Sequence, residues 1–167
     1  MDGSSVEGAE NLPYEIANLD VTYAMVNPPV PVGYWRSVGS SQNAFVTEAF
    51  FDEVARAAGR DPYELRLELL ADQPRHRGVL ELAATKAGWG EPLPAGRARG
   101  IAVAKSFGSY CAQVAEVELD AKRVRVKRVV CAIDCGQIVN PAIIEAQMES
   151  GIAYGLNATL SGEITIG

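Results

Sequence analysis

The sequence is poor in the residues that build disulfide frameworks and metal sites. It contains three cysteines and one histidine in 167 residues. Cys131 and Cys135 are separated by three residues, so they do not form the Cys-x-x-Cys pair that is typical of zinc and iron–sulfur ligands. We therefore expect three reduced, mostly buried thiols, including Cys111, and no metal ligands from this chain.

Long apolar runs and an excess of positive charge are also missing. No run approaches the length of a membrane-spanning helix, and we expect neither a span nor a signal peptide. The net charge is -6 and the basic residues are scattered, which argues against a nucleic-acid partner. The glycines match neither the P-loop nor the dinucleotide pattern. Ser40 and Ser41 have no histidine in a triad pattern, which argues against a serine hydrolase.

Helical spacing of apolar residues dominates the stretch from Gln42 to Ala87. Helices are predicted over 42–58, from Asp61-Pro62 to a point before Pro74, and over 75–87. Asp61 is the expected N-cap of the second helix, with Glu64 as its capping-box partner. The residues expected to face inward are Val46, Phe50, Val54 and Ala58 in the first helix and Val79, Leu80, Ala83, Ala84 and Ala87 in the third.

The period changes to two after Gly100, which predicts antiparallel strands over 101–107, 112–119 and 123–133 with a hairpin at 120–122. Further strands are predicted over 16–26 and from Glu163 to Ile166. The chain stops inside the last of these, which indicates a truncated fragment. Residues 1–11 are small, polar and acidic, and we expect them to be disordered or cloning-derived. Residues 12–167 are expected to form an α+β structure, a mainly antiparallel sheet with three to four packed helices.

A glycine-flanked run, Gly33 to Ser41, leads into the first helix. An extended segment before a helix N-terminus presents free N–H groups that suit an anion or oxo group, and Arg36 adds a cation. The alternative is a buried structural turn with Arg36 in an ion pair.

The helix that follows Asn140-Pro141 contains two glycines four residues apart, Gly151 and Gly155, which each cost roughly 1 kcal/mol relative to alanine. Gln147 lies one turn before Gly151, so its amide is expected beside bare backbone. That arrangement suits recognition of a flat heterocycle. The alternative is tight helix-on-sheet packing with Gln147 bonded to a nearby loop.

The acidic residues do not suggest a general base. Glu48, Asp52 and Glu53 lie on a helix flank and are expected to be solvated or paired. Asp134 follows a strand and is expected to bond loop amides. His76 lies between two arginines and is expected at the surface. We therefore assign no catalytic residue to this chain.

Two motifs together resemble the large subunit of the molybdenum hydroxylases, the xanthine dehydrogenase/aldehyde oxidase family. The first joins Tyr34-Trp-Arg-Ser-Val-Gly39 to a stretch from Phe45 to Arg66 that includes Glu48 and Asp52-Glu53. The second runs from Asp134-Cys-Gly-Gln-Ile-Val-Asn-Pro141 through Gln147 and Gly151 to Gly155. The short distance between them, with Ser106 to Val117, resembles the isoquinoline 1-oxidoreductase beta-subunit group.

The resemblance implies a molybdenum–molybdopterin cytosine dinucleotide cofactor and hydroxylation of an N-heterocycle or aldehyde with oxygen from water. Arg36 matches an arginine whose backbone lies against the molybdenum centre, and Val38 matches a substrate-pocket position. Gln147 matches the glutamine that bonds the pterin, beside Gly151. The expected partner is an iron–sulfur subunit with two [2Fe-2S] clusters, in a bacterial cytoplasm or periplasm.

Parts of the family pattern are missing from this sequence. The family's catalytic glutamate belongs to a motif downstream of Gly167, and the upstream Gly-Gln-Gly loop is absent. Residues 12–167 are thus expected to be part of a molybdopterin-binding domain, truncated at its C-terminus, which neither holds the cofactor tightly nor turns over alone. The alternative is a non-catalytic scaffold or interaction module, such as a homodimer through a free sheet edge.

Overall fold

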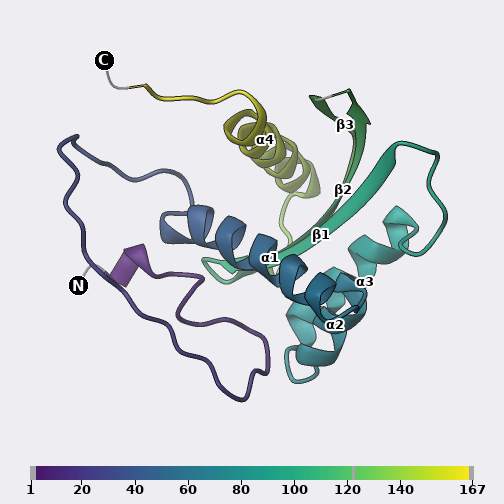
Figure 1. The fold of residues 1–167 in the computed structure, drawn as a ribbon, viewed down its shortest axis with the longest axis horizontal. Helices are drawn as coiled ribbons and strands as arrows, with labels where there is room; N and C mark the ends of the chain where they lie inside the picture. Colours follow the sequence, from purple (N-terminus) through teal and green to yellow (C-terminus); the bar gives the residue numbers. More distant parts are fainter. Residues whose placement is uncertain (1–2, 122, 166–167) are drawn as a thin grey trace.

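A computed structural model describes residues 3–121 and 123–165. In this part of the chain, four α-helices accompany one three-stranded antiparallel sheet of order β1-β2-β3 (Figure 1). This confirms the expected α+β class. The elements are a short 3-10 helix η1 (Gly3–Ser5), α1 (Gly39–Ala57), α2 (Pro62–Leu69), α3 (Pro74–Ala87), β1 (Arg97–Ser106), β2 (Ser109–Asp120), β3 (Arg123–Asp134) and α4 (Pro141–Leu160).

The sheet forms one side of the core. Val103, Ala112 and Ala132 are aligned across the three strands and all are buried. α3 packs against all three strands, and α1 packs against β1 and α2. Buried positions on the strands and helices form one continuous cluster. The three predicted strands and their antiparallel pairing are therefore confirmed.

The two hairpins set the strand boundaries. The first strand ends at Ser106, not Phe107, because Phe107 and Gly108 both have positive φ and form a two-residue turn between the paired Ser106 and Ser109. Positive φ at both turn residues gives the turn a twist that matches the right-handed twist of the two paired strands. The second hairpin joins the paired Asp120 and Arg123, and Lys122 of the expected turn lies outside the described residues.

The helix ends of α2 and α3 follow the local sequence. The Asp61 carboxylate accepts the backbone N–H groups of Tyr63 and Glu64 at 2.8 and 3.1 Å, which confirms Asp61 as the N-cap. Gly88 adopts the left-handed conformation after α3, with φ of 68°. The inward residues predicted for α3 are all buried.

The buried face of α1 differs from the prediction. Val46, Phe50 and Val54 are exposed, and the buried side chains of this helix are Glu48, Phe51 and Ala55. The apolar stripe suggested by spacing was therefore wrong. The reason is that Glu48 pairs with the buried Arg66 of α2, so the face of α1 that contains Glu48 packs against the core.

Glu48 and Arg66 form a buried ion pair at the centre of the fold. Arg66 is 0% exposed, and its Nε donates to Glu48 Oε2 at 3.1 Å. Its Nη1 donates to Asp52 at 2.7 Å. Glu48 also accepts the Tyr14 hydroxyl at 2.6 Å and the Val103 N–H at 2.8 Å. The expectation that Glu48 and Asp52 are solvated or paired is thus resolved in favour of pairing.

His76 is buried, and the expectation of a surface position was wrong. Its side chain on α3 is 5% exposed and lies edge-on to the Tyr110 ring, with centroids 4.7 Å apart. Burial, and then the charges of Lys105 and Arg75, lower the pKa of His76 to about 4. The flanking Arg75 turns to solvent and pairs with Asp134, so charged neighbours in sequence did not indicate exposure.

The cysteines are half-buried, which is less burial than expected. The sulfur atoms of Cys111 and Cys131 lie 3.5 Å apart on neighbouring strands. This contact lowers the pKa of Cys111 to about 7. Among the described residues no group of three or more His, Cys, Asp or Glu side chains could hold a metal ion.

The segments before α1 and after α4 depart from the predictions. Residues 16–26 form no strand, and neither do residues 163–165, while Ile166 lies outside the described residues. Disorder was expected for residues 1–11, of which 3–11 are described. Here Val6 is buried, and the Asn43 amide donates to the carbonyls of Ser5 and Glu7, both at 2.9 Å. This segment is therefore anchored to α1.

We expect Glu48→Gln to lower the free energy of unfolding by about 3 kcal/mol, because Arg66 would keep only Asp52 as an anionic partner in a buried site. Urea denaturation followed by circular dichroism measures the change. Glu53→Gln is the matched control, since Glu53 is exposed on the same helix. Equal stability of the two variants would contradict the central role of the pair.

We also expect stability to fall by about 2 kcal/mol between about pH 7 and pH 5 because of His76. The folded-state pKa near 4 lies below the unfolded value of 6.5, so the unfolded chain binds a proton first as pH falls. Denaturation at several pH values tests this. His76→Gln should remove this dependence, and an unchanged pH profile in that variant would contradict the assignment.

Candidate functional site

The two segments singled out from the sequence meet in space. A groove of about 1000 Å³ lies between the turn before α1 and the middle of α4. Figure 1 shows α4 next to the N-terminal part of α1. Arg36, Gln147 and Gly151 all line the groove, whereas Val38 does not. The other lining residues are Trp35, Ser37, Ser41, Gln42, Phe45, Met148, Ser150, Tyr154, Gly155, Ala158 and Thr159.

A tight turn places Arg36 at this groove. Ser37 and Val38 have left-handed φ values of 66° and 49°, so the extended segment expected up to Gly39 is wrong. The Ser37 and Ser41 hydroxyls both donate to the Arg36 carbonyl at 2.6 Å. These bonds offset the strain of two non-glycine residues in that region.

Gly39 allows the turn to pack closely. A Cβ atom built on Gly39 would overlap the Ser4 carbonyl oxygen, so this position at the start of α1 requires glycine. Val38, the N-cap residue, provides no side-chain cap for the first N–H groups of the helix. Ser41 and Gln42 belong to the first turn of α1 and line the groove, so the positive end of the helix dipole lies at the groove wall.

One hydrogen bond connects the two walls. Arg36 Nη2 donates to Gln147 Oε1 at 2.6 Å. Arg36 forms no ion pair with any described residue, so the alternative interpretation of a buried, ion-paired Arg36 fails. Gln147 accepts this hydrogen bond from a nearby turn, which agrees with the alternative interpretation that Gln147 is bonded to a loop. Its amide N–H groups have no partner in the described part of the chain.

The glycines of α4 do not serve close packing within the described residues. A Cβ atom built on Gly151 or Gly155 would meet nothing within 4 Å. No residue of α4 is buried, and the helix makes only marginal contact with other elements. Helix-on-sheet packing, the alternative for this motif, is therefore absent here. The two glycines instead leave a bare strip along the groove.

Aromatic rings flank this strip. Trp35, Phe45 and Tyr154 line the groove, and each is more than half exposed. Sequence reasoning did not assign these three residues to the site. Trp35 and Phe45 could have been found through their places in the first family motif, but no sequence pattern indicated Tyr154. Together with the Gln147 amide, these rings suit a flat, partly polar ligand.

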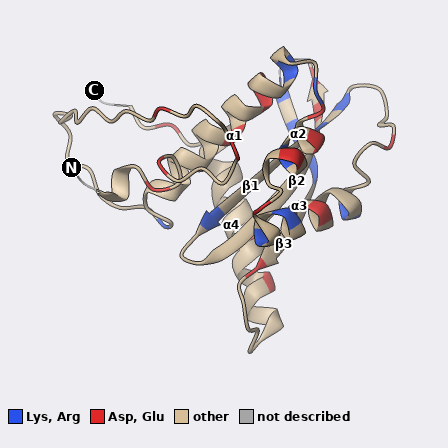
Figure 2. Ribbon diagram, turned by 90° about the horizontal axis from the view of Figure 1, so that it is seen from below, with Lys and Arg blue, Asp and Glu red and all other residues tan. Residues whose placement is uncertain are grey.

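The charge of the groove is simple. Arg36 is the one charged side chain among the described lining residues, and no carboxylate lies in the walls. In Figure 2, α4 is almost entirely tan, with acidic colour at few positions. The groove can therefore bind an anionic or neutral group, but its described residues offer no general base.

Comparison with known proteins adds to this geometry. Residues 37–167 match the molybdopterin cofactor-binding domain model. The chain is 33% identical over 142 residues to the beta subunit of isoquinoline 1-oxidoreductase from Brevundimonas diminuta, covering 82% of this chain and 18% of that protein. It is 31% identical over 175 residues to a nicotinate dehydrogenase subunit from Pseudomonas putida, covering 92% and 14%.

A third relative is the membrane-bound aldehyde dehydrogenase [pyrroloquinoline-quinone] of Gluconacetobacter polyoxogenes, 30% identical over 149 residues, with 77% of this chain and 19% of that protein covered. The chain thus spans less than a fifth of the length of each of these relatives. None of the helices in the described residues has the length and apolar character required to cross a membrane.

We expect Gly151→Ala and Gly155→Ala each to stabilise α4 by about 1 kcal/mol, because alanine is the better helix former and the added methyl group meets open space. Hydrogen exchange of the α4 amides measures this local stability. Ala153→Gly, at an exposed position between them, is the control and should have the opposite effect. Faster exchange in the alanine variants would indicate close packing at the glycines.

Proposed function

The chain belongs to the molybdopterin cofactor-binding domain family, and we propose that its groove is one wall of the cofactor site of a molybdenum-dependent oxidoreductase. The observation that carries this proposal is the meeting of Arg36, Gln147 and the bare strip at Gly151 in one groove. These residues come from segments far apart in the chain, and the resemblance to the molybdenum hydroxylases implies that Arg36 and Gln147 correspond to positions at the cofactor.

The groove has the chemistry that a pterin and its phosphates require. Gln147 offers amide N–H donors beside an exposed backbone strip, which suits the polar edge of a flat heterocycle. Arg36 and the uncapped N-terminus of α1 favour an anionic group. The aromatic side chains supply apolar surface for a ring system. These features support a fit, and the cytosine dinucleotide form is the finer part of the proposal.

When bound, the molybdenum centre would supply the transfer of oxygen from water to a substrate carbon. Arg36 would fix the turn against Gln147, and Gln147 would orient the ring by hydrogen bonds. Val38 adjoins the groove residue Ser37, and we propose it as a residue of the substrate pocket. The relatives' names support an N-heterocycle or an aldehyde as the substrate. An iron–sulfur subunit with two [2Fe-2S] clusters would accept the electrons.

The described chain offers only part of such a site. Its groove is lined only by residues 35–45 and by α4, and among these described residues there is no carboxylate to act as a base. We therefore propose that the 167 residues alone neither retain the cofactor tightly nor catalyse oxidation. Residues 12–167 would form part of a larger cofactor-binding domain.

Expression in a host that makes the cofactor tests both statements. Molybdenum content and dye-linked oxidation of heterocycles and aldehydes should be negligible for the 167 residues and substantial for protein expressed from the complete gene. In the latter, Gln147→Ala should weaken cofactor retention about tenfold, as expected for a lost hydrogen bond to a charged or polar ligand. Gly151→Leu should abolish retention by filling the strip.

Glu149→Gln is the matched control, because Glu149 is exposed on α4 and does not line the groove. Unchanged molybdenum and pterin content in both Gln147→Ala and Gly151→Leu would overturn the proposed cofactor wall. Substantial metal and activity in the 167-residue chain would overturn the proposal that it needs further walls.

The second candidate is a non-catalytic scaffold or dimerising module. The observation in its favour is the unpartnered α4, together with β1 and β3, which are edge strands of the described sheet. This candidate predicts a homodimer without bound pterin, which a mass measurement in solution would detect. The mass should be the same for the Gln147→Ala variant.

A further inference from the structure

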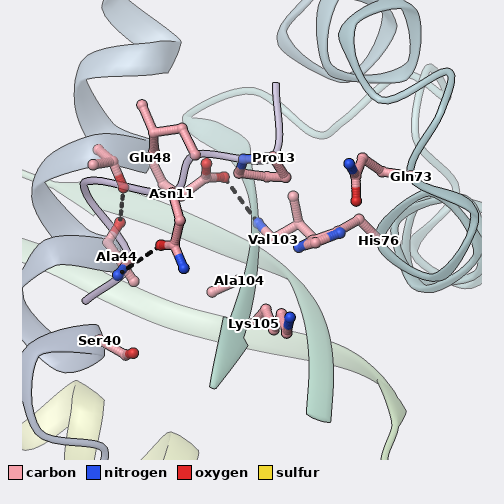
Figure 3. A pocket seen from close by; sticks show the side chains of 13 residues that line it. Asn11, Pro13, Ser40, Ala44, Glu48, Gln73, His76, Val103, Ala104 and Lys105 are labelled. Carbon is pink, nitrogen blue, oxygen red and sulfur yellow. Dashed lines mark hydrogen bonds between the residues drawn. The ribbon is translucent and has the colours of Figure 1, made fainter. Parts of the chain in front are cut away.

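A second cavity, of about 250 Å³, lies apart from the groove (Figure 3). It is lined by four parts of the chain and shares no lining residue with the groove. Its walls come from residues 8–13, from α1, from the start of α3 and from β1. Its volume is several times the ~30 Å³ that one water molecule occupies, so it has room for a small organic molecule.

His76 gives this cavity a chemically unsatisfied group. The imidazole extends from α3 into the cavity in Figure 3 and is more than nine-tenths buried. Its Nδ1 atom is buried and has no hydrogen-bond partner in the described structure. Because buried polar atoms are nearly always bonded, this ring nitrogen at a cavity wall is expected to bond a water molecule or a ligand in the cavity.

The charges around His76 favour an anion. Lys105, from β1, lines the cavity and forms no ion pair with any described residue. The neighbouring Arg75 is paired with Asp134, and Tyr110 presents its ring to both His76 and Lys105. The positive charges of Lys105 and Arg75 add to burial in holding the pKa of His76 near 4.

Glu48 is the one carboxylate in the cavity wall, and its charge is already compensated. Its oxygens accept hydrogen bonds from Tyr14, Arg66 and the Val103 backbone, so neither oxygen is free to balance Lys105. Among the described residues, the cavity thus presents an ammonium group without an ion-pair partner and a ring nitrogen, His76 Nδ1, without a hydrogen-bond partner. Other donors in its wall are the amides of Asn11 and Gln73 and the hydroxyl of Ser40.

We propose that this cavity binds a small organic carboxylate, with its charge at Lys105 and a carboxylate oxygen bonded to His76 Nδ1. A carboxylate accepts hydrogen bonds at both oxygens, which matches the donors of the wall. The apolar side chains of Leu12, Pro13 and Val103 suit a short carbon skeleton, which an inorganic anion lacks. This site does not depend on the proposed molybdenum function.

Binding at this site is linked to protonation of His76. A carboxylate placed beside the imidazole favours its charged form, so the pKa of His76 rises when the ligand binds. By linkage, the ligand binds more tightly as the pH falls below about 6, through the bound and free pKa values of His76, the free value being about 4. No covalent bond is made or broken, and in this range binding is accompanied by uptake of a fraction of a proton from the solvent.

Nuclear magnetic resonance tests the proposal directly, since the chain has one histidine and its ring signals are unambiguous. Lactate is the probe, because it keeps a carbon skeleton and remains ionised in mildly acidic solution. Saturating lactate should raise the pKa of His76 by about one unit, equivalent to about tenfold tighter binding to the protonated protein. Chloride at the same ionic strength should leave the titration unchanged.

Lys105→Gln should weaken lactate binding about tenfold without unfolding the chain, because Lys105 is exposed. Lys86→Gln is the matched control, an exposed lysine on α3 outside the cavity. An unchanged His76 titration in lactate, or equal weakening by both lysine variants, would overturn the site. Equal or tighter binding of sulfate would overturn its assignment to a carboxylate.

Discussion

The buried pair of Glu48 and Arg66 holds together parts of the chain that are distant in sequence. Glu48 accepts hydrogen bonds from the segment before α1 through Tyr14, from α2 through Arg66 and from β1 through the Val103 N–H. A fully buried guanidinium is tolerated only when anions surround it, and here Glu48 and Asp52 do so from one helix. The orientation of α1 on the sheet, and with it the position of the Arg36 turn, depends on this cluster.

The groove inherits its geometry from that orientation. α1 can begin at Gly39 only because the missing side chain admits the Ser4 carbonyl, and the two serine hydroxyls hold the strained turn before it. Arg36 then reaches Gln147. Apart from the Asn140 N-cap bond, this is the one side-chain hydrogen bond that joins α4 to the rest of the described residues. Placement of α4 therefore relies on a single polar contact and on its connection to β3, and not on a packed face.

Sequence reasoning succeeded where local rules decide the structure and failed where distant partners do. Asp61, Gly88 and the period of the strands depend on neighbours in the chain, and they were predicted correctly. The buried face of α1 depends on Arg66 of another helix, and His76 is buried by the sheet, so neither could be derived from spacing. Of the candidate site, Arg36, Gln147 and Gly151 were found from two unusual local patterns, while the flanking aromatic residues were not.

The glycines of α4 connect these observations to function. A helix without a packed face gains little from tertiary contacts, so glycine at two interior positions lowers a stability that is already small. No described residue comes close enough to need that space. The smaller cavity beside His76 differs, because four parts of the chain line it and because His76 Nδ1 is buried there without a hydrogen-bond partner among the described residues. One site is thus shaped by missing side chains, whereas the other is characterised by the buried His76 nitrogen and the nearby Lys105, and α1 contributes a wall to each.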